Sequence, residues 1–405
     1  MEYVKVKDLG QIVTGNTPST SDMSNYGDFM PFIKATDIIL GSRYTYNTEQ
    51  GYSEKSYKKY KVNLVPKGST CIVTIGSIGK KMTQAHTDLF VNQAINAILP
   101  YKQFDKDYIY YVSKYAILPQ LKIYDSGTTS GRENISKSSF SNIKLFVEEN
   151  LPKQQKIASI LSTYDTLIEN NNRRIRLLEQ MAENLYKEWF VRFRFPGHEK
   201  LENGLPKEWD IRIKDLTQLK SGYAFKSSWF VDEGEAIAKI KDIGETIMDT
   251  SSFSYVSKDN CIKAEKFLLT EGDLTIALTG ATIGKISIVP KHKGNIYTNQ
   301  RLGKFFLGKN PIEKLPFLYC LFKQKAMVSN IINLSNSSSA QPNISPEQIE
   351  SIKILGDKEV INSFNKACKH IFSMILSIHS QNTLLTRQRD LLLPRLMSGK
   401  LEVKP

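Results

Sequence analysis

Apolar residues follow a heptad pattern in one long segment of the chain, residues 154–192. They recur at alternating steps of four and three residues, as the stripe of a coiled-coil helix does. The stripe consists of Ile157, Leu161, Tyr164, Ile168, Asn171, Ile175, Leu178, Ala182, Leu185 and Trp189. Asn171 is its one strongly polar member, a residue type that fixes the register of paired helices at some cost in stability. Pro152 suits the first turn of this helix, and Pro196-Gly197 is expected to end it.

A second stripe of the same kind lies near the end of the chain. It consists of Val360, Phe364, Ala367, Ile371, Met374, Ile378, Gln381, Leu385, Gln388 and Leu392, and its helix is expected to end at Pro394 and Gly399. Two helices of similar length can bury both stripes by lying antiparallel. We therefore expect an intramolecular coiled coil about 58 Å long, with one globular domain at each end and a pseudo-twofold axis between them. The alternative is that each helix packs only on its own domain.

The segments before the two helices have a mixed pattern. Short β-branched runs bounded by Gly or Pro predict strands at 30–38, 70–76, 89–100, 236–243, 274–279 and 286–290. Helical periodicity predicts helices at 106–118 and 314–332. Long polar connections lie at 14–28, 41–61, 125–139, 226–235 and 335–346. Loops of that length inside a compact domain are usually functional.

The chain also repeats itself at an offset of 205 to 209 residues. Five short matches occur in one order, among them Lys34…Asp37 with Lys239…Asp242 and Asn92-Gln93 with Asn299-Gln300. Matched glycines, Gly15 and Gly222, belong to the same series. A period this long indicates a duplicated two-part unit rather than a solenoid. The predicted fold class is α+β, with two globular mixed α/β domains at 1–150 and 197–355, a first coiled-coil helix at 151–196, and a second helix with a C-terminal tail at 356–405.

Composition and charge narrow the function. The 405 residues carry 55 Lys and Arg against 41 Asp and Glu, a net charge of +14, and both halves of the chain are basic. This favours a polyanionic partner, DNA or RNA, although a generic basic protein has the same balance. The four cysteines form no CxxC, no apolar run is long enough to span a membrane, and no signal peptide is evident. We expect a cytoplasmic protein.

Catalytic patterns are not evident in the sequence, and we predict no catalytic or metal-binding residues. The turns Gly76–Lys81 and Gly280–Lys285 have the wrong spacing for a phosphate-binding loop, and we interpret them as tight strand-to-strand turns with an exposed lysine. Two interpretations of Lys34…Asp37 and Lys239…Asp242 stay open, part of a nuclease site or a strand-end pair that orients a loop. The pairs Asn92-Gln93 and Asn299-Gln300 are interpreted as structural.

The polar loops combine side chains that bind phosphate with side chains that read bases. The DNA-binding candidates of the first domain are Thr17, Ser19, Lys34, Thr36, Arg43, Lys55, Lys58, Lys59, Lys80, Lys81, Thr128, Thr129 and Arg132. Those of the second domain are Lys226, Ser227, Lys239, Lys241, Thr279, Thr282, Lys285, Arg301, Ser338 and Gln341.

The whole layout resembles the specificity subunit of Type I restriction-modification systems, which carries two target recognition domains, each followed by a helical region. The most specific resemblances are the segment 151–157 (LPKQQKI), the segment 389–401 (RDLLLPRLMSGKL), and the loop 342–345 (PNIS). The first unit's counterpart of that loop, residues 132–136, lacks the proline, and the second helix opens with Asp357-Lys358-Glu359-Val360 in place of the LPxQQ pattern.

This resemblance implies a non-catalytic, DNA-binding subunit of a restriction system that reads a bipartite, asymmetric target in double-stranded DNA. Its implied partners are two methyltransferase subunits and motor/nuclease restriction subunits, to which methyl donor, ATP and Mg would belong. One alternative is the recognition subunit of a related system with a fused methyltransferase-nuclease partner. Another is a coiled-coil RNA-binding or scaffolding protein, which sequence-specific binding to duplex DNA would distinguish.

The coiled coil predicts a fixed distance between the two half-sites. A two-reader protein of this kind is expected to bind half-sites about one helical turn apart, roughly 34–36 Å. Inserting a second copy of Leu177-Leu178-Glu179-Gln180 lengthens the first helix by about 6 Å, and such a stutter unwinds a coiled coil locally without destroying it. At roughly 3.4 Å per base pair, we expect unchanged half-sites and a preferred spacer one to two base pairs longer. Methylation or binding on targets with graded spacers measures this, and an unmoved preference in a folded, active variant contradicts it.

Overall fold

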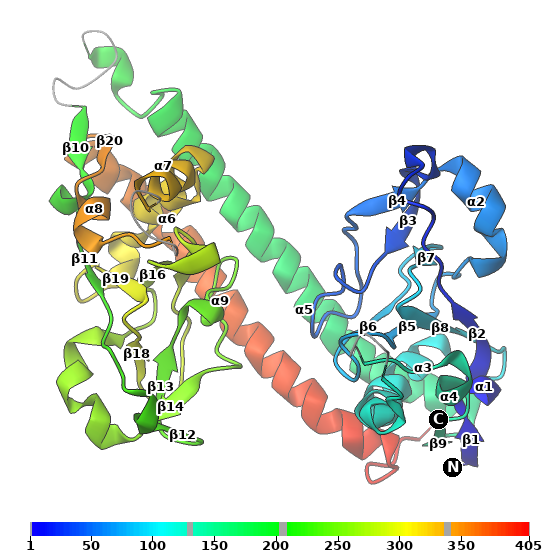
Figure 1. The fold of residues 1–405 in the computed structure, drawn as a ribbon. Helices are drawn as coiled ribbons and strands as arrows, with labels where there is room; N and C mark the ends of the chain where they lie inside the picture. Colours follow the sequence, from blue (N-terminus) through cyan, green and yellow to red (C-terminus); the bar gives the residue numbers. More distant parts are fainter. Residues whose placement is uncertain (1, 128–132, 202–208, 336–341, 405) are drawn as a thin grey trace. The chain divides into compact units, whose positions relative to one another are not determined.

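The computed structural model of the chain describes residues 2–127, 133–201, 209–335 and 342–404. It divides into two compact units, Met1–Asn170 with Leu384–Pro405, and Asn171–Thr383. Two long helices, α5 (Leu151–Tyr186) and α9 (Lys358–Met397), each contribute to both units (Figure 1). The units therefore divide the chain differently from the four segments expected from the sequence.

The first unit contains three small antiparallel or mixed sheets. Its strands are β1 (Glu2–Lys5), β2 (Gly10–Thr14), β3 (Tyr26–Ile33), β4 (Gln50–Tyr52), β5 (Thr70–Val73), β6 (Met82–Gln84), β7 (Phe90–Val91), β8 (Ile95–Pro100) and β9 (Lys144–Val147). Its shorter helices are α1 (Val6–Leu9), α2 (Glu54–Tyr60), α3 (Lys106–Val112) and α4 (Lys137–Ser141). The sheet orders are β2-β8-β5-β6, β4-β3-β7 and β1-β9.

The second unit repeats this topology with two added edge strands. Its strands are β10 (Asp210–Arg212), β11 (Gln218–Ser221), β12 (Phe230–Val231), β13 (Glu235–Ala238), β14 (Ser254–Val256), β15 (Leu268–Leu269), β16 (Leu274–Ala277), β17 (Ile286–Ile288), β18 (Ile296–Thr298), β19 (Leu302–Phe306) and β20 (Lys353–Leu355). Its shorter helices are α6 (Leu315–Lys323), α7 (Lys325–Ser335) and α8 (Pro346–Glu350). The sheet orders are β11-β19-β16-β17, β12-β14-β13-β18-β15 and β10-β20.

Strand order confirms the duplication that the short sequence matches predicted. The four-stranded sheets have the same order, and the parallel pair β3–β7 recurs as β13–β18. The matched glycines share one cause, the close approach of two backbones. A Cβ atom on Gly15 would lie 2.1 Å from the carbonyl oxygen of Val91, and one on Gly222 would lie 2.3 Å from that of Thr298. No larger residue fits at either place without moving the backbone.

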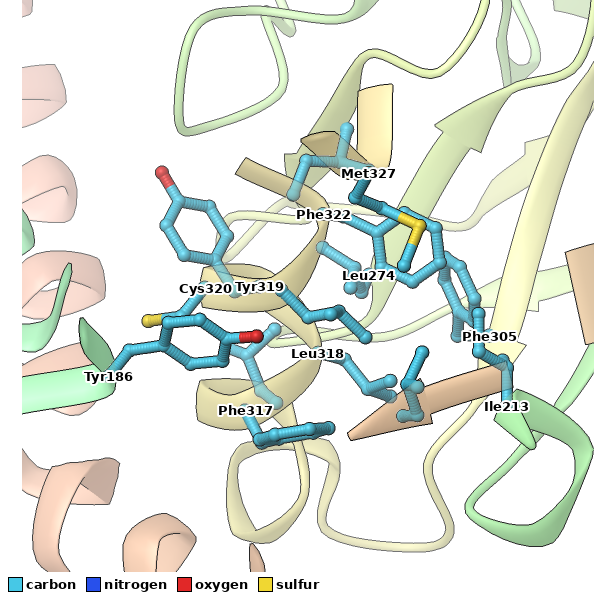
Figure 2. Packing of buried hydrophobic residues seen from close by; sticks show 14 of the residues in the cluster. Tyr186, Ile213, Leu274, Phe305, Phe317, Leu318, Tyr319, Cys320, Phe322 and Met327 are labelled. Carbon is cyan, nitrogen blue, oxygen red and sulfur yellow. The ribbon is translucent and has the colours of Figure 1, made fainter. Parts of the chain in front are cut away.

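The core of each unit is built on a helix that lies beside the coiled-coil pair. In the second unit α6 is buried on nearly every side, because eight of its nine residues are buried. Figure 2 shows Phe317 and Tyr319 of this helix with Tyr186 of α5, while Phe322 lies with Phe305 of β19. The predicted helix at 314–332 is therefore two helices, with Gln324 in extended conformation between them.

Helices α5 and α9 are antiparallel within each unit, as predicted. In the first unit Ile157 and Leu161 share a core with Leu393 and Leu396, and Asp165 pairs with Arg389. In the second unit the Asn171 side chain donates to Asn382 over 2.9 Å. Just after the end of α5, the centres of the Trp189 and Phe364 rings are 5.6 Å apart. Residues later in the first helix therefore contact residues earlier in α9, as expected for an antiparallel pair.

The stripe predicted on α5 is largely confirmed. Ile157, Leu161 and Asn171 are buried, whereas Ile168, Ile175, Leu178 and Leu185 are half-buried. Asn171 has the register-fixing role expected of a polar residue in such a stripe, because its amide is buried against another amide.

The stripe predicted on α9 is wrong by one residue over much of its length. Met374 is 43% exposed and Gln381 is exposed, while their neighbours Ile375 and Asn382 are buried. Arg389 is buried as well. The buried polar residues have polar partners on α5, so a count of apolar positions could not find them. Ile378 is buried, and Ile371, Leu385 and Leu392 lie half-buried beside the stripe.

Of the two predicted end signals of α9, Pro394 does not end the helix, which continues to Met397 and stops just before Gly399. A proline inside a helix removes one backbone hydrogen bond and crowds the preceding turn. Pro394 is exposed, and its neighbours Leu393, Leu396 and Met397 are buried in the core of the first unit. Burial of these three side chains compensates for the missing bond.

The amide pair at the centre of the coiled coil gives a test of its energetics. Asn382 accepts from Asn171 over 2.9 Å and donates to Asn172 over 2.8 Å. Replacing Asn382 alone by Leu leaves the buried Asn171 amide without its partner, which costs about 1–3 kcal/mol of the free energy of unfolding. The double variant N171L/N382L should recover that loss. Denaturant unfolding of the three chains measures this, and additive losses in the double variant would show that the two amides do not act as a pair.

Candidate nucleic-acid interface

In each unit, loops from several strands are joined by backbone hydrogen bonds where the strands end. We call this group of loops the strand-end cluster, residues 34–37, 74–81, 92–94 and 133–135 in the first unit and residues 239–242, 278–285, 299–301 and 342–344 in the second. The backbone amide of Asn92 donates to the Ile33 carbonyl, and the backbone amide of Asn299 donates to the Ala238 carbonyl, each over 3.0 Å. The two clusters are thus built by matching backbone bonds, and a structural role of the Asn92 and Asn299 side chains stays a prediction.

A second set of matching bonds attaches the last loop of each cluster. In the first unit the Ile135 amide donates to Thr74 over 2.9 Å, and in the second the Ile344 amide donates to Leu278 over 3.0 Å. These bonds hold the loops to the ends of strands β5 and β16. The loops are therefore positioned by the sheets and not by their own sequence.

The repeated lysine–aspartate pairs form turns that orient the cluster. The Asp37 carboxylate accepts the backbone amide of Lys34 over 2.8 Å, and Asp242 accepts that of Lys239 over the same distance. A carboxylate held by its own backbone in this way caps a turn. This supports the loop-orienting interpretation over the nuclease one. Burial is the main cause that raises the pKa of Asp242.

The glycine–lysine turns connect adjacent antiparallel strands, which confirms their interpretation as tight turns. One joins β5 to β6 and the other β16 to β17. Gly79 and Gly284 have φ values of +72° and +79°, a conformation that glycine adopts without strain. The lysines that follow, Lys80 and Lys285, are exposed. Among the described residues no hydrogen bond or ion pair engages either ammonium group.

Other candidates in these clusters are tied to neighbours. Lys81 donates to the Ala35 carbonyl over 2.9 Å, and Lys34 pairs with Glu49 over 2.8 Å. Lys241 bonds the Ser252 carbonyl. Arg301 and Thr36 have exposed side chains.

Two threonines of the second cluster are in a different situation. The hydroxyl oxygens of Thr279 and Thr282 are shielded from solvent, and neither has a hydrogen-bond partner among the described residues. Both lie at the turn between β16 and β17, beside the bridge from Thr279 to Asn343. The two hydroxyl groups therefore lie beneath the surface of the turn.

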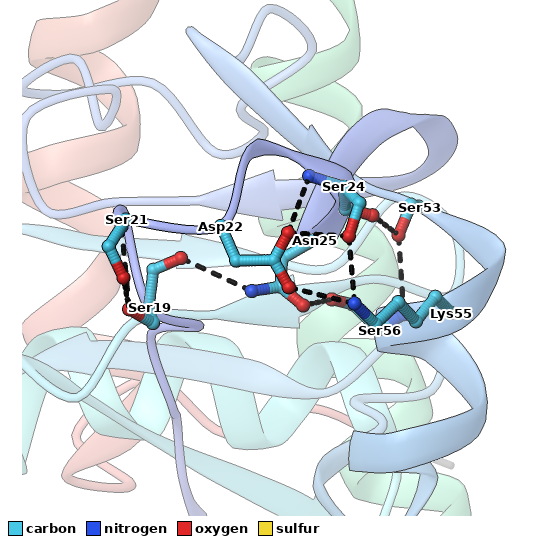
Figure 3. A network of polar contacts seen from close by, with 8 residues as sticks. All are labelled: Ser19, Ser21, Asp22, Ser24, Asn25, Ser53, Lys55 and Ser56. Atoms are coloured by element: carbon cyan, nitrogen blue, oxygen red, sulfur yellow. Dashed lines mark hydrogen bonds and ion pairs between the residues drawn. The ribbon is translucent and has the colours of Figure 1, made fainter.

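A second polar surface of the first unit lies beside α2 (Figure 3). Lys55 reaches Asp22 and the Ser24 hydroxyl, each over 2.7 Å. Bonds from Lys55 and Ser24 lower the pKa of Asp22 from 3.8 to about 2. Because this pKa is lowered, the pair is intact at neutral pH and is lost only as the pH falls below 3.8 toward 2. Figure 3 also shows Ser19 with Ser21 and Asn25.

The remaining lysines of α2 also have neighbours. Lys58 pairs with Glu54 over 2.7 Å, and the Lys59 ammonium lies 5.2 Å from the centre of the Tyr60 ring. The Thr17 hydroxyl bonds the side chain of Gln93, which is exposed. The sequence pattern favours a structural role for Gln93, but its position beside Thr17 makes it a surface candidate.

The corresponding surface of the second unit combines cations with aromatic rings. The Lys226 ammonium lies 5.4 Å from the centre of the Trp229 indole, and Ser227 between them in sequence is exposed. Lys239 lies 3.8 Å from the centre of the Phe230 ring and donates to the Ser254 hydroxyl over 2.9 Å. Burial lowers the pKa of Lys239.

Arg43 is a wrong prediction, because it is not on the surface. Only 6% of this residue is exposed, and its guanidinium contacts Gln84 over 2.8 Å and Asp107 over 2.6 Å. A buried arginine paired in this way holds the loop 41–49 to strand β6 and helix α3. Five further candidates, Thr128, Thr129, Arg132, Ser338 and Gln341, lie outside the described residues.

Two other features are absent from the described residues. No described helix is both long and apolar enough to cross a membrane. In the same part of the chain, no three His, Cys, Asp or Glu side chains gather as ligands of a metal ion would.

Both copies of the duplicated unit match the model of one protein family. The model of the family described as Type I restriction modification DNA specificity domain matches residues 1–180 and again residues 206–355. The chain belongs to this family.

Full-length relatives agree with the family match. The chain is 26% identical to the MjaIX specificity subunit of a Type I restriction enzyme from Methanocaldococcus jannaschii, over 99% of this chain and 93% of that one. It is 25% identical to the MjaVIII specificity subunit of the same organism, over 100% and 98%. The crystal structure of a Type I restriction-modification S subunit from M. genitalium has the same fold, with a TM-score of 0.57 and 18% identity over 98% of this chain and 96% of that one.

The two free lysines give a test of phosphate binding. Each lysine–phosphate interaction that a substitution removes should reduce the slope of log affinity against log salt by about 0.9, with little change in sequence preference. We expect this of K80A and of K285A. Matched controls are K102A and K309A, whose exposed lysines follow the far ends of β8 and β19. Binding titrations over a range of salt concentrations measure the slopes. Equal slopes for test and control variants would remove the glycine–lysine turns from the interface.

Proposed function

We propose that the chain is the DNA-recognition subunit of a Type I restriction-modification complex, and that each strand-end cluster contacts one half of a bipartite, asymmetric target. The observation that supports this most is a comparison of the two strand-end clusters. Some matched positions hold the same residue in both clusters, and others hold different residues. Lys34 matches Lys239, and Lys80 matches Lys285. At other matched positions the residues differ.

Of the identical lysines, the unengaged pair Lys80 and Lys285 suits contacts to phosphate, which position a protein on DNA without reading sequence. The differing positions suit base contacts. Thr36 in the first cluster is matched by Lys241, and Ala94 is matched by the exposed Arg301. Arginine can pair bidentately with guanine, whereas alanine offers only an apolar contact. Two clusters that share their phosphate contacts and differ in their base contacts read two different half-sites.

Catalysis is assigned to partner subunits. The sequence has no nucleotide-binding or nucleophile motif, and the aspartates of the repeated turns are engaged by backbone amides. We therefore place the methyl donor, ATP and Mg with two methyltransferase subunits and with motor/nuclease restriction subunits. A scaffolding role is not favoured, because the family match covers both recognition units and not only the helices.

Methylation mapping tests this function directly. The chain is produced together with its partner methyltransferase subunits, and the modified positions in the host genome are found by single-molecule sequencing. We expect two short, different half-sites separated by a spacer of fixed length. A continuous target, a palindromic target, or no sequence preference would contradict the proposal.

Exchange of one recognition domain tests the assignment of half-sites. Residues 1–150 are replaced by the first domain of another family member, leaving α5, α9 and the second unit unchanged. Because each cluster is built within its own unit, we expect one half-site to change and the other to stay. The reciprocal exchange of residues 197–355 serves as the matched control. A change in both half-sites after either exchange would show that the two units do not read independently.

A further inference from the structure

An exposed apolar turn stands beside the strand-end cluster of the first unit. Ile39 is 69% exposed and Leu40 is 63% exposed, directly after the turn that Lys34 and Asp37 form. We call these two side chains the apolar tip. Apolar side chains left in water at a binding surface commonly mark a contact with a partner.

The apolar tip is held by a tight turn. The Ser42 amide donates to the Ile39 carbonyl over 3.3 Å, and Gly41 has a φ of +81°. A Cβ atom added to Gly41 would meet nothing within 4 Å, so the turn points into open space. The chain on either side is anchored, because Ile38 is 1% exposed and Arg43 is held by Asp107. The chain is therefore anchored to the first unit on both sides of the tip.

The surroundings of the tip favour nucleic acid as the partner. The tip adjoins the exposed Thr36 in sequence, and Lys81 bonds the carbonyl of Ala35 in the same turn. Lys80, whose ammonium is free of partners among the described residues, precedes Lys81. A lysine can bind a DNA phosphate, and an apolar side chain at the same surface can enter a base step as a wedge.

The second unit has no such tip at the matched position. Gly244 and Glu245 occupy the places of Ile39 and Leu40 at the offset of 205. A Cβ atom on Gly244 would lie 2.1 Å from the Ile247 carbonyl, and the Glu245 carbonyl accepts from Lys323 over 2.6 Å. These contacts hold the backbone of Gly244 and Glu245 against the rest of the second unit. The apolar tip is therefore not repeated at the matched position of the second unit.

We propose that the apolar tip, Ile39 and Leu40, inserts at one base step of the first half-site and partly unstacks it. This rests on the proposed function and adds a way of reading sequence that needs no hydrogen bond to a base. Pyrimidine–purine steps unstack most easily, so the tip selects such a step through the energy of deforming it. The second half-site is read without this contribution.

The test uses the double variant I39S/L40S in the full chain. The control is V62S, because Val62 is 83% exposed in the same unit and lies outside the turn. Duplexes carry the fluorescent base 2-aminopurine at successive positions of the first half-site. With the wild-type chain and with V62S we expect fluorescence to rise at one step, and with I39S/L40S it should not. Affinity for the target should fall about tenfold in the double variant, since the unstacked step is stabilised by the inserted side chains.

A mismatched base pair at the same step gives a second measurement. A mismatch lowers the cost of unstacking, so it should tighten binding by the wild-type chain more than binding by I39S/L40S. Unchanged fluorescence and affinity in the double variant would overturn the proposal. So would normal DNA binding combined with a failure to assemble with the methyltransferase, which would identify the tip as a protein contact. If the wild-type chain shows no sequence-specific binding at all, the proposed function fails instead.

Discussion

The two compact units depend on one packing arrangement, the antiparallel contact of α5 with α9. Each unit takes part of its core from both helices, Leu161 with Leu396 in the first and Tyr186 with Phe364 in the second. Apolar stripes alone allow helices to slide past one another by a heptad. The buried pairs Asn171–Asn382 and Asp165–Arg389 remove that freedom, because any other register leaves polar groups unpaired in a nonpolar environment.

Polar side chains on the helices also attach the recognition domains. Gln154 is fully buried, accepts the Asp105 amide over 2.8 Å and donates to the Glu148 carbonyl over 2.7 Å. On α9, Asn365 accepts the Phe317 amide over 2.9 Å. Both side chains therefore satisfy backbone groups where a domain helix begins. Gln154, the first glutamine of the LPKQQ segment, thus has a structural role. In the second unit a different residue on a different helix, Asn365 of α9, has the same role.

Comparison of the two duplicated units distinguishes the residues that build a recognition surface from those that differ on it. The bonds that hold the two strand-end clusters recur, as do the positions of the turn glycines and lysines. The residues between them differ, as Thr36 and Lys241 do, and the matched position of the second unit has Gly244 and Glu245 in place of the apolar tip. A fixed arrangement of loops can therefore present new base contacts without repacking its core, because the sheets and backbone bonds carry the geometry.

The sequence by itself determined the duplication, the two long helices and some of the central strands, because these depend on periodicity and on short matches at one offset. It also indicated the tight turns after β5 and β16, where glycine and lysine spacing suffices. Only the tertiary structure showed that Arg43 is an interior residue and that the α9 stripe includes Asn382 and Arg389. Those outcomes depend on partners distant in sequence, Asp107, Asn171 and Asp165, which decide whether a polar side chain can be buried. Exposure of Ile39 and Leu40 was likewise decided by the fold, since their composition alone is typical of a core.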